Sequence, residues 1–253
     1  MSDRGALLFA RYAYPPNALG YCGPPDSAAL LEYAAAGVCD GGLVDLAGRF
    51  EGAWPYLELI AAANGLDDPL DERVVRAYWV GNDLLRATDP SLLMGSLSER
   101  FVRRAGSSWR LVSEAVLAGG PAHHNFHVMA VYPWIGLLRA GHSGPEPLHV
   151  LDRCRIRWGR VLGVDGPTAV VRSRSLGWDG RVVTLGQPRV EQVVTSANGY
   201  SLAGELRPDD WVALHWDWVC DRLTGRELAE LERATRGAMA ATSPPPRRMP
   251  VPA

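Results

Sequence analysis

Residues 153–171 read R-C-R-I-R-W-G-R-V-L-G-V-D-G-P-T-A-V-V, and this stretch indicates the fold of the last third of the chain. Up to Val164, polar or charged side chains alternate with apolar ones, which is the period of a β-strand. Asp165-Gly166 is a hairpin turn signal, and an apolar run follows it. We therefore expect strands over 155–164 and 168–173, paired as an antiparallel hairpin.

Downstream of this hairpin the chain has the same strand-like character in three further segments, 181–185, 189–195 and 211–216. Asp179-Gly180 marks another tight turn. Five short strands with tight turns are typical of a small closed barrel of the OB type. A charged amphipathic helix is expected over 223–236, and the Pro-rich tail over 238–253 predicts a disordered segment.

Upstream of the stretch, apolar residues recur every three to four positions, which predicts helices. Such helices are expected over 27–50 with a break at Gly41-Gly42, and over 54–64, 71–79, 82–86, 90–104, 107–118 and 121–139. Residues 14–25 hold two Pro-Pro pairs and predict a loop. The Gly- and Pro-rich segment 140–148 is the best domain boundary.

The sequence thus predicts an α+β protein in three parts. An all-α domain covers residues 1–145, and a small OB-like β-barrel domain with a C-terminal helix covers residues 150–237. The disordered tail makes up residues 238–253.

Composition restricts the class of protein. The chain has 253 residues, 47% of them hydrophobic, so it can bury a sizeable core, and its net charge of −2 offers no basic field for nucleic acid. No apolar run approaches the roughly 20 residues that span a bilayer. Four cysteines without Cys-x-x-Cys spacing do not make a disulfide framework. We expect a cytoplasmic protein with neither membrane nor nucleic-acid partner.

Two residues at opposite ends of the expected barrel carry metal-ligand chemistry. Cys154 opens it, on one strand face with Trp158 and opposite the neighbouring arginines, and His215 lies in its last strand. Thiolate and neutral imidazole bind soft or borderline metals. Asp217, expected on the same face, would orient the His215 ring, and Trp216 would shield it. The alternative to metal binding is that Cys154 packs as a small apolar residue of the core and that His215 is a hydrogen-bonded core or surface residue.

The module from Cys154 to about Thr235 resembles the HypC family of NiFe-hydrogenase maturation chaperones. The family begins its barrel with a Cys and a strand and turn that match C-R-I-R-W-G-R-V-L-G-V-D-G-P-T-A-V-V, with Cys154, Gly159, Val161, Asp165 and Ala169 in register. Its Gly-Asp-Tyr-Val-Leu-Val-His-Ala-Gly strand matches P-D-D-W-V-A-L-H-W-D, with Asp210, Trp211, Val212, Leu214 and His215 in register. The acidic helix after it matches L-T-G-R-E-L-A-E-L-E.

The resemblance implies a carrier rather than an enzyme. Cys154 and His215 would hold iron as the Fe(CN)2(CO) fragment, with its cyanide and carbon monoxide ligands, on the way to the hydrogenase large subunit precursor. Other maturation factors would be further partners, and the helical domain would dock one of these proteins.

The helical half contains a histidine cluster of its own. In a helix His123 and His127 share a face and can hold a metal, with His124 beside them. The absence of an H-E-x-x-H pattern argues against a metalloprotease, and the apolar run that follows favours a structural role. Cys22 offers a thiol on a Pro-bounded loop, and a second metal site follows if it meets His127.

Two other functions remain open at this point. One is a metal- or thiol-dependent enzyme with its site between the helical domain and the barrel, since domain interfaces favour pockets. The other is a nucleic-acid module whose exposed strand face carries Arg153, Arg155, Arg157 and Arg160, which the acidic net charge argues against.

Overall fold

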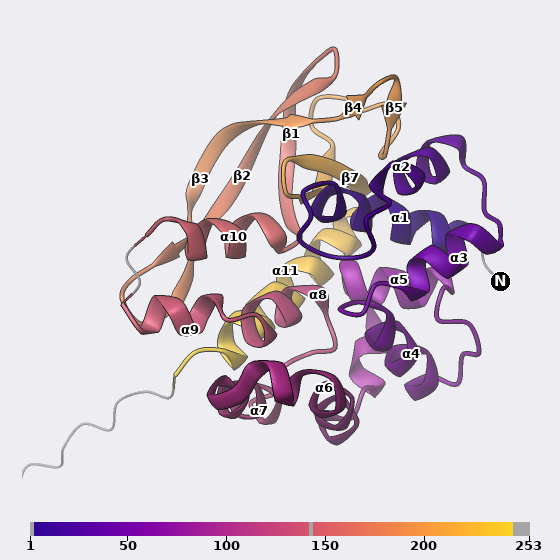
Figure 1. The fold of residues 1–253 in the computed structure, drawn as a ribbon. Coiled ribbons are helices and arrows are strands. Elements are labelled where there is room, and N and C mark those ends of the chain that lie inside the picture. The colour runs from indigo at the N-terminus through magenta and orange to yellow at the C-terminus, as the bar shows by residue number, and fades with distance from the viewer. Residues whose placement is uncertain (1–2, 142–143, 245–253) are drawn as a thin grey trace, which may run out of the picture.

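The computed structural model of the chain describes residues 3–141 and 144–244. Its N-terminal part consists of helices, drawn in indigo to rose in Figure 1. They are α1 (Asp3–Ala18), α2 (Ser27–Ala36), α3 (Gly41–Gly48), α4 (Trp54–Ala63), α5 (Glu72–Trp79), η1 (Asp83–Ala87), α6 (Pro90–Ala105), η2 (Gly106–Ser108), α7 (Trp109–Leu117), α8 (His124–Phe126), the π-helical turn η3 (His127–Val131), α9 (Trp134–Arg139) and α10 (Glu146–Cys154).

The C-terminal part contains the strands. They are β1 (Arg157–Asp165), β2 (Thr168–Trp178), β3 (Val183–Val194), β4 (Ser196–Ala197), β5 (Tyr200–Ser201), β6 (Trp211–His215) and β7 (Trp218–Leu223), followed by helix α11 (Gly225–Ala241). The predicted α+β class is confirmed: helices come first, then a five-stranded sheet, then a C-terminal helix.

The five main strands pair in the order β1-β2-β3-β7-β6, and β6 pairs again with β1. Every pairing is antiparallel except that of β3 with β7, which consists of a single parallel pair, Val194 with Trp218. The predicted Asp165-Gly166 turn joins β1 to β2 as expected. β4 and β5 form a separate two-stranded sheet.

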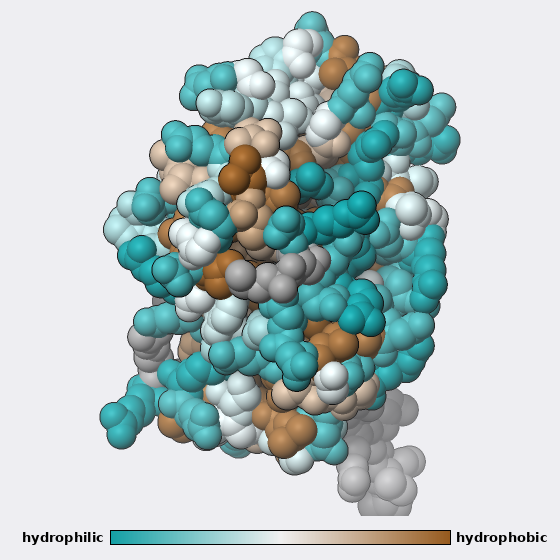
Figure 2. All heavy atoms as spheres, turned by 90° about the vertical axis from the view of Figure 1, so that its right-hand side faces the viewer, coloured by the Kyte–Doolittle hydropathy of each residue, from teal (hydrophilic) through white to brown (hydrophobic). Residues whose placement is uncertain are grey.

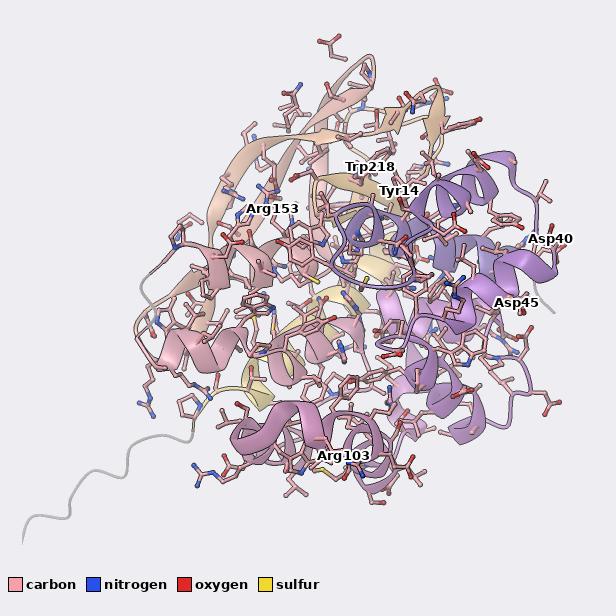
Figure 3. All side chains as sticks on the ribbon, in the orientation of Figure 1. Tyr14, Asp40, Asp45, Arg103, Arg153 and Trp218 are labelled. Carbon is pink, nitrogen blue, oxygen red and sulfur yellow. The ribbon has the colours of Figure 1, made fainter. Side chains whose placement is uncertain are left out.

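Helix α11 runs through the middle of the molecule, between the strands and helices α7 and α8 (Figure 1). Helix α1 contacts β6 and β7 from the other side. Tyr14 of α1 and Trp218 of β7 meet edge to face with ring centroids 5.1 Å apart (Figure 3). Helices α1 and α11 thus pack against β7, and α1 also contacts β6.

Two hydrophobic cores result from this arrangement. The smaller core lies inside the sheet and includes Val212 and Leu214 of β6. The larger core joins residues of the helical part to Ala213 and to Leu231 of α11. Strand β6 thus alternates as predicted, and His215 faces the helical part, where its ring lies 5.7 Å from the Trp79 ring.

The surface over α2, α3 and α4 is mostly hydrophilic, with hydrophobic side chains in small separate areas (Figure 2). Among the described residues, every helix is too short or too polar to cross a bilayer.

The predicted loop over residues 14–25 is wrong at its start, because α1 continues through Pro15 and Pro16 to Ala18. Proline inside a helix removes one backbone donor and leaves the carbonyl four residues earlier unpaired. Here the helix ends two residues later, so the disturbance is confined to its last turn.

Residues around the predicted domain boundary also differ from the prediction. Helix α10 forms directly before β1, so Cys154 ends a helix instead of opening a strand; residues 142–143 of the boundary lie outside the described residues. The single helix expected over 121–139 is divided into α8, η3 and α9, with Pro133 at the last break.

The C-terminal elements differ in their limits. β3 is one long strand where two were expected, and β7 was not anticipated. Helix α11 extends to Ala241, into the predicted disordered tail, whose residues 245–253 lie outside the described residues.

Candidate metal centre

Three buried side chains with metal-ligand chemistry converge between the helical part and the sheet. They are His124, Cys154 and His215, whose ligand atoms all lie within 4.8 Å of one another. His124 begins α8, Cys154 ends α10 and His215 ends β6. The predicted pair Cys154 and His215 therefore meets, and a third ligand joins it that the sequence did not single out.

His215 is held in one tautomer. Its Nδ1 lies 2.7 Å from the backbone carbonyl oxygen of Tyr12. A carbonyl only accepts, so Nδ1 carries the hydrogen and the lone pair is on Nε2. Nε2 is buried and makes no hydrogen bond among the described residues. The Tyr12 carbonyl is free for this contact because Pro16, four residues later, has no N–H to donate.

His124 has the opposite tautomer. Its Nε2 lies 2.9 Å from the carbonyl oxygen of Cys154, so Nε2 donates and the lone pair is on Nδ1. The hydroxyl of Tyr78 lies 3.2 Å from that Nδ1 and 3.5 Å from the carbonyl oxygen of Gly52. Tyr78 thus has a second acceptor within reach, and turning to it would free the His124 lone pair.

Burial sets the protonation states. It lowers the pKa of His124 to about 4 and moves that of His215 well below its usual value, with the neighbouring imidazole adding to the effect on His215. Burial also raises the pKa of the Cys154 thiol, with a further contribution from Cys22. At neutral pH the two rings are neutral and able to coordinate, whereas a metal has to displace the thiol proton.

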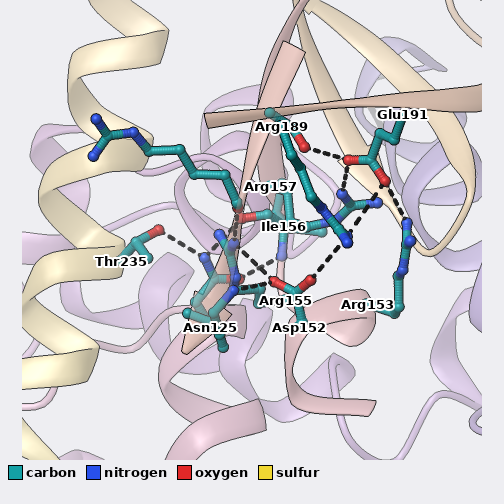
Figure 4. A network of polar contacts seen from close by, with 12 residues as sticks. Asn125, Asp152, Arg153, Arg155, Ile156, Arg157, Arg189, Glu191 and Thr235 are labelled. Atoms are coloured by element: carbon teal, nitrogen blue, oxygen red, sulfur yellow. Dashed lines mark hydrogen bonds and ion pairs between the residues drawn. The ribbon is translucent and has the colours of Figure 1, made fainter. Parts of the chain in front are cut away.

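A buried ion-pair network fixes the chain on both sides of Cys154 (Figure 4). Asp152 accepts from Arg155 at 3.0 Å and from the backbone N–H of Leu176 at 2.8 Å. Arg157 bonds to Glu191 and donates to the carbonyl oxygen of Trp216 at 2.6 Å. The end of α10 and the start of β1 are therefore tied to β2, β3 and the β6–β7 turn.

This network corrects the expected exposed arginine face. Arg155 and Arg157 are fully buried, because Arg155 lies between α10 and β1, and Arg157 is the first residue of β1, where its side chain bonds to Glu191 and to the Trp216 carbonyl oxygen. Buried guanidinium groups need carboxylate partners, and these have them. Two of the four arginines proposed to contact nucleic acid are thus unavailable to it.

Asp217 does not orient His215, contrary to expectation. Strand β6 ends at His215, and Trp216 has a φ of 53°, so the chain turns and Asp217 leaves the expected face. Asp217 is mostly exposed and pairs with Arg153 at 3.0 Å. Trp216 is buried and stacks on Tyr21 with centroids 4.3 Å apart, and its shielding of His215 stays a prediction.

Asn125 joins the histidine segment to β1 and α11 (Figure 4). Its Oδ1 accepts from the backbone N–H of Ile156 at 2.6 Å, and its Nδ2 donates to the Ile156 carbonyl oxygen and to the Thr235 hydroxyl at 3.0 and 2.9 Å. Asn125 directly follows His124, and Ile156 lies two residues after Cys154, so these bonds tie the segment of one ligand to the segment of the other.

A pocket of about 130 Å³ adjoins two of the three ligands. Cys154 and His124 line it together with Cys22 and His127, the two residues whose meeting the sequence left open; among the described residues these two are not part of the group of converging ligands. A larger cavity of about 910 Å³ between α7, η3, α9 and the end of α11 contains none of these residues.

His123 is not at the pocket or among the three converging ligands. Its Nδ1 accepts from the backbone N–H of Asn125 at 3.0 Å and caps α8. A regular helix would place residues 123 and 127 on one face, but α8 is a single turn that starts only after His123, so His124 points to the site instead. The histidine cluster of the sequence contained His124, but the prediction assumed a helix that includes His123, whereas α8 begins at His124.

Comparison with known proteins gives one family. A model described as a family of unknown function, DUF6390, matches residues 1–248 of the chain. Neither the curated proteins nor the solved structures contain a match.

Proposed function

The chain belongs to the DUF6390 family, and on that premise we propose that it is a metal-handling assembly protein in which His124, Cys154 and His215 hold the cargo. The observation that carries the proposal is the convergence of the three ligand atoms within 4.8 Å. We propose further that the five-stranded sheet is an OB-like barrel of the HypC type, as the ring of strand pairings supports.

The donor set fits a soft or borderline metal. One thiolate and two neutral imidazoles are typical ligands of iron, zinc, copper or nickel, and three protein ligands leave a position for ligands that the metal brings. The unpartnered Nε2 of His215 supports this use, because a buried ring nitrogen without a hydrogen bond is costly unless something binds it.

The surrounding charge suits a thiolate. The network beside Cys154 contains four arginines and three carboxylates, which leaves one formal positive charge in excess: Arg153, Arg155, Arg157 and Arg189 with Asp152, Glu191 and Asp217. A positive surrounding favours the loss of the Cys154 proton when a metal binds. It also suits a cargo of low or negative charge such as Fe(CN)2(CO).

In this proposal the protein performs ligand exchange rather than turnover. Cys154 gives up its proton as the sulfur binds the metal, and His215 binds through its free Nε2. His124 binds through Nδ1 after the Tyr78 hydroxyl has turned to the Gly52 carbonyl oxygen. Cysteines of a hydrogenase large subunit precursor would then compete for the metal and release it. All four cysteines are free thiols, which suits the reducing cytoplasm in which we place this exchange.

A second function is favoured by the pocket. Its position beside Cys154 and His124 also suits a metal- or thiol-dependent enzyme with a small substrate. The two functions differ in outcome, because an enzyme regenerates its metal centre in each cycle whereas a carrier loses its metal to the client.

The test is purification of the full chain without oxygen from cells that make a NiFe hydrogenase. We expect iron in the protein, infrared bands of metal-bound cyanide and carbon monoxide, and loss of both on mixing with the large subunit precursor. The same chain carrying Cys154→Ser should lack them. Iron that stays bound in the presence of the precursor would contradict the carrier function.

A further inference from the structure

The pocket beside the three ligands contains a second polar group that the proposed metal centre does not use. His127 lines the pocket, is buried, and has a Nε2 without a hydrogen-bond partner among the described residues. A Cβ placed on Gly52, another wall residue, would lie 3.5 Å from that Nε2. Nε2 therefore faces the space of the pocket next to Gly52.

The hydrogen on His127 can be assigned from its other nitrogen. Nδ1 lies 3.1 Å from the hydroxyl oxygen of Tyr56, and both side chains are buried. If Nδ1 carried the hydrogen, the Tyr56 O–H would have no acceptor among the described contacts, which is costly in a buried place. The hydroxyl therefore donates to Nδ1, and Nε2–H is a donor directed at the pocket.

Besides Cys22, His124, His127 and Cys154, the wall consists of apolar and aromatic residues. Phe50, Trp79, Tyr132 and Trp134 contribute to it, and none of the lining residues in the described chain is a carboxylate or a guanidinium. A volume of about 130 Å³ is comparable to that of an engineered apolar cavity of about 150 Å³ that holds a single benzene molecule or xenon atom. The pocket thus suits a ligand of a few atoms that has one hydrogen-bond acceptor.

We propose that this pocket is the binding site for a small linear anion that occupies an open position of the metal. One end of the anion bonds to a metal held by Cys154 and His124, which share the pocket wall, and the other end accepts a hydrogen bond from His127 Nε2. Tyr56 positions His127 for this role. The inference rests on the proposed metal centre and adds the chemical class of its additional ligand.

The test uses the full chain loaded with Co²⁺ under nitrogen and azide as the probe. The visible spectrum of bound cobalt reports metal binding, and its change on addition of azide reports the anion. We expect His127→Phe to bind Co²⁺ as the unmodified chain does and to bind azide at least tenfold more weakly. Gly52→Ala adds a methyl group beside Nε2 and should weaken azide binding in the same way. It keeps every hydrogen bond of the three metal-binding side chains.

Tyr56→Phe separates a positioning role from simple packing. It leaves His127 Nδ1 without its donor, so the ring can change tautomer, and azide should bind severalfold more weakly with unchanged Co²⁺ affinity. Equal azide affinity in all four chains, with Co²⁺ bound, would overturn this inference and leave the metal centre intact. Failure of the unmodified chain to take up Co²⁺ would instead contradict the metal centre, and the anion site with it.

Discussion

The Nδ1 atom of His215 and the carbonyl oxygen of Tyr12 lie 2.7 Å apart, although 203 positions separate them in the sequence. The contact exists because Pro16 cannot donate to that carbonyl within helix α1. A proline near the end of the first helix thus determines which nitrogen of a histidine in β6 is free to bind a metal. Such outer partners of metal-binding histidines fix ring orientation and tautomer.

Pro16→Ala should therefore separate metal affinity from stability. The new N–H competes for the Tyr12 carbonyl, so metal affinity should fall by about tenfold, the lower end of what loss of such a partner costs. The free energy of unfolding should change little, because the helix gains a backbone hydrogen bond while the buried Nδ1 of His215 loses its acceptor. Metal titration and urea unfolding measure the two quantities.

Pro15→Ala is the matched control, because its new N–H would face the Arg11 carbonyl, which makes no contact with the metal ligands. Equal losses of metal affinity in both variants would contradict the role given to the Tyr12 carbonyl.

The sequence predicts much of the fold but less of the site. The period of three to four residues identified α2 to α7, and the Asp-Gly turn identified the β1–β2 hairpin. Pro-Pro is a strong loop signal, yet α1 passes through it, because tertiary packing and a new donor for the Tyr12 carbonyl compensate for the missing bond. Local signals cannot report such a distant partner.

The three metal ligands were likewise predicted only in part. Cys154 and His215 were predicted as a pair, and they meet. His124 was not predicted as a ligand. The direction of its side chain depends on helix α8, which begins directly after His123. Hydrogen bonds of Asn125 with the His123 ring and with Ile156 hold this helix start in place. Strand alternation placed Arg155 and Arg157 on the surface, and it failed because helix α10 reaches Cys154.

Acid should destabilise the protein from about pH 6.5 downwards. Burial lowers the pKa of His123 and His127 to about 3 and of His124 to about 4, and His215 is shifted in the same direction. These groups take up protons in the unfolded chain before they do so in the folded one, so stability present above pH 6.5 is lost as the pH falls towards 4. At pH 5 His123, His124 and His127 each contribute a loss of about 2 kcal/mol.

Urea unfolding at a series of pH values measures this loss, and a chain with His123→Asn should show a shallower slope. Stability that is constant between pH 7 and 5 would be incompatible with neutral buried rings.

Glu191→Gln should cost about 3 kcal/mol of unfolding free energy or more, because it leaves the buried Arg157 without its carboxylate. Burial would raise the pKa of Glu191, but Arg157, Ser173 and Arg153 together lower it to about 2. The stability that Glu191 contributes is therefore present above about pH 4.5 and lost as the pH falls towards 2.

The matched control for Glu191→Gln is Asp209→Asn, which removes the exposed ion pair with Arg160 at 2.9 Å. Exposed pairs contribute at most about 1 kcal/mol. Chemical unfolding measures the loss of unfolding free energy in both variants. Similar losses in the two would argue against a buried network that positions Cys154.

Metal binding should release one proton. The pKa of Cys154 is raised by burial, so its thiol is protonated at neutral pH, whereas the histidines hold no proton to compete. Metal affinity should then rise about tenfold per pH unit between pH 6 and 8. Calorimetry of Co²⁺ or Zn²⁺ binding in buffers of different ionisation enthalpy gives the proton count, and a count of zero would rule out Cys154 as a ligand.

The central claim is that His124, Cys154 and His215 form one metal site, and the most direct measurement is metal bound per chain after anaerobic loading and removal of free metal. We predict one equivalent for the unmodified chain and for Cys220→Ser, whose cysteine is also buried but lies outside the three ligands. Cys154→Ser and His215→Gln should lose most of it while their circular dichroism stays unchanged. Full metal content in either of these two folded variants would contradict the account.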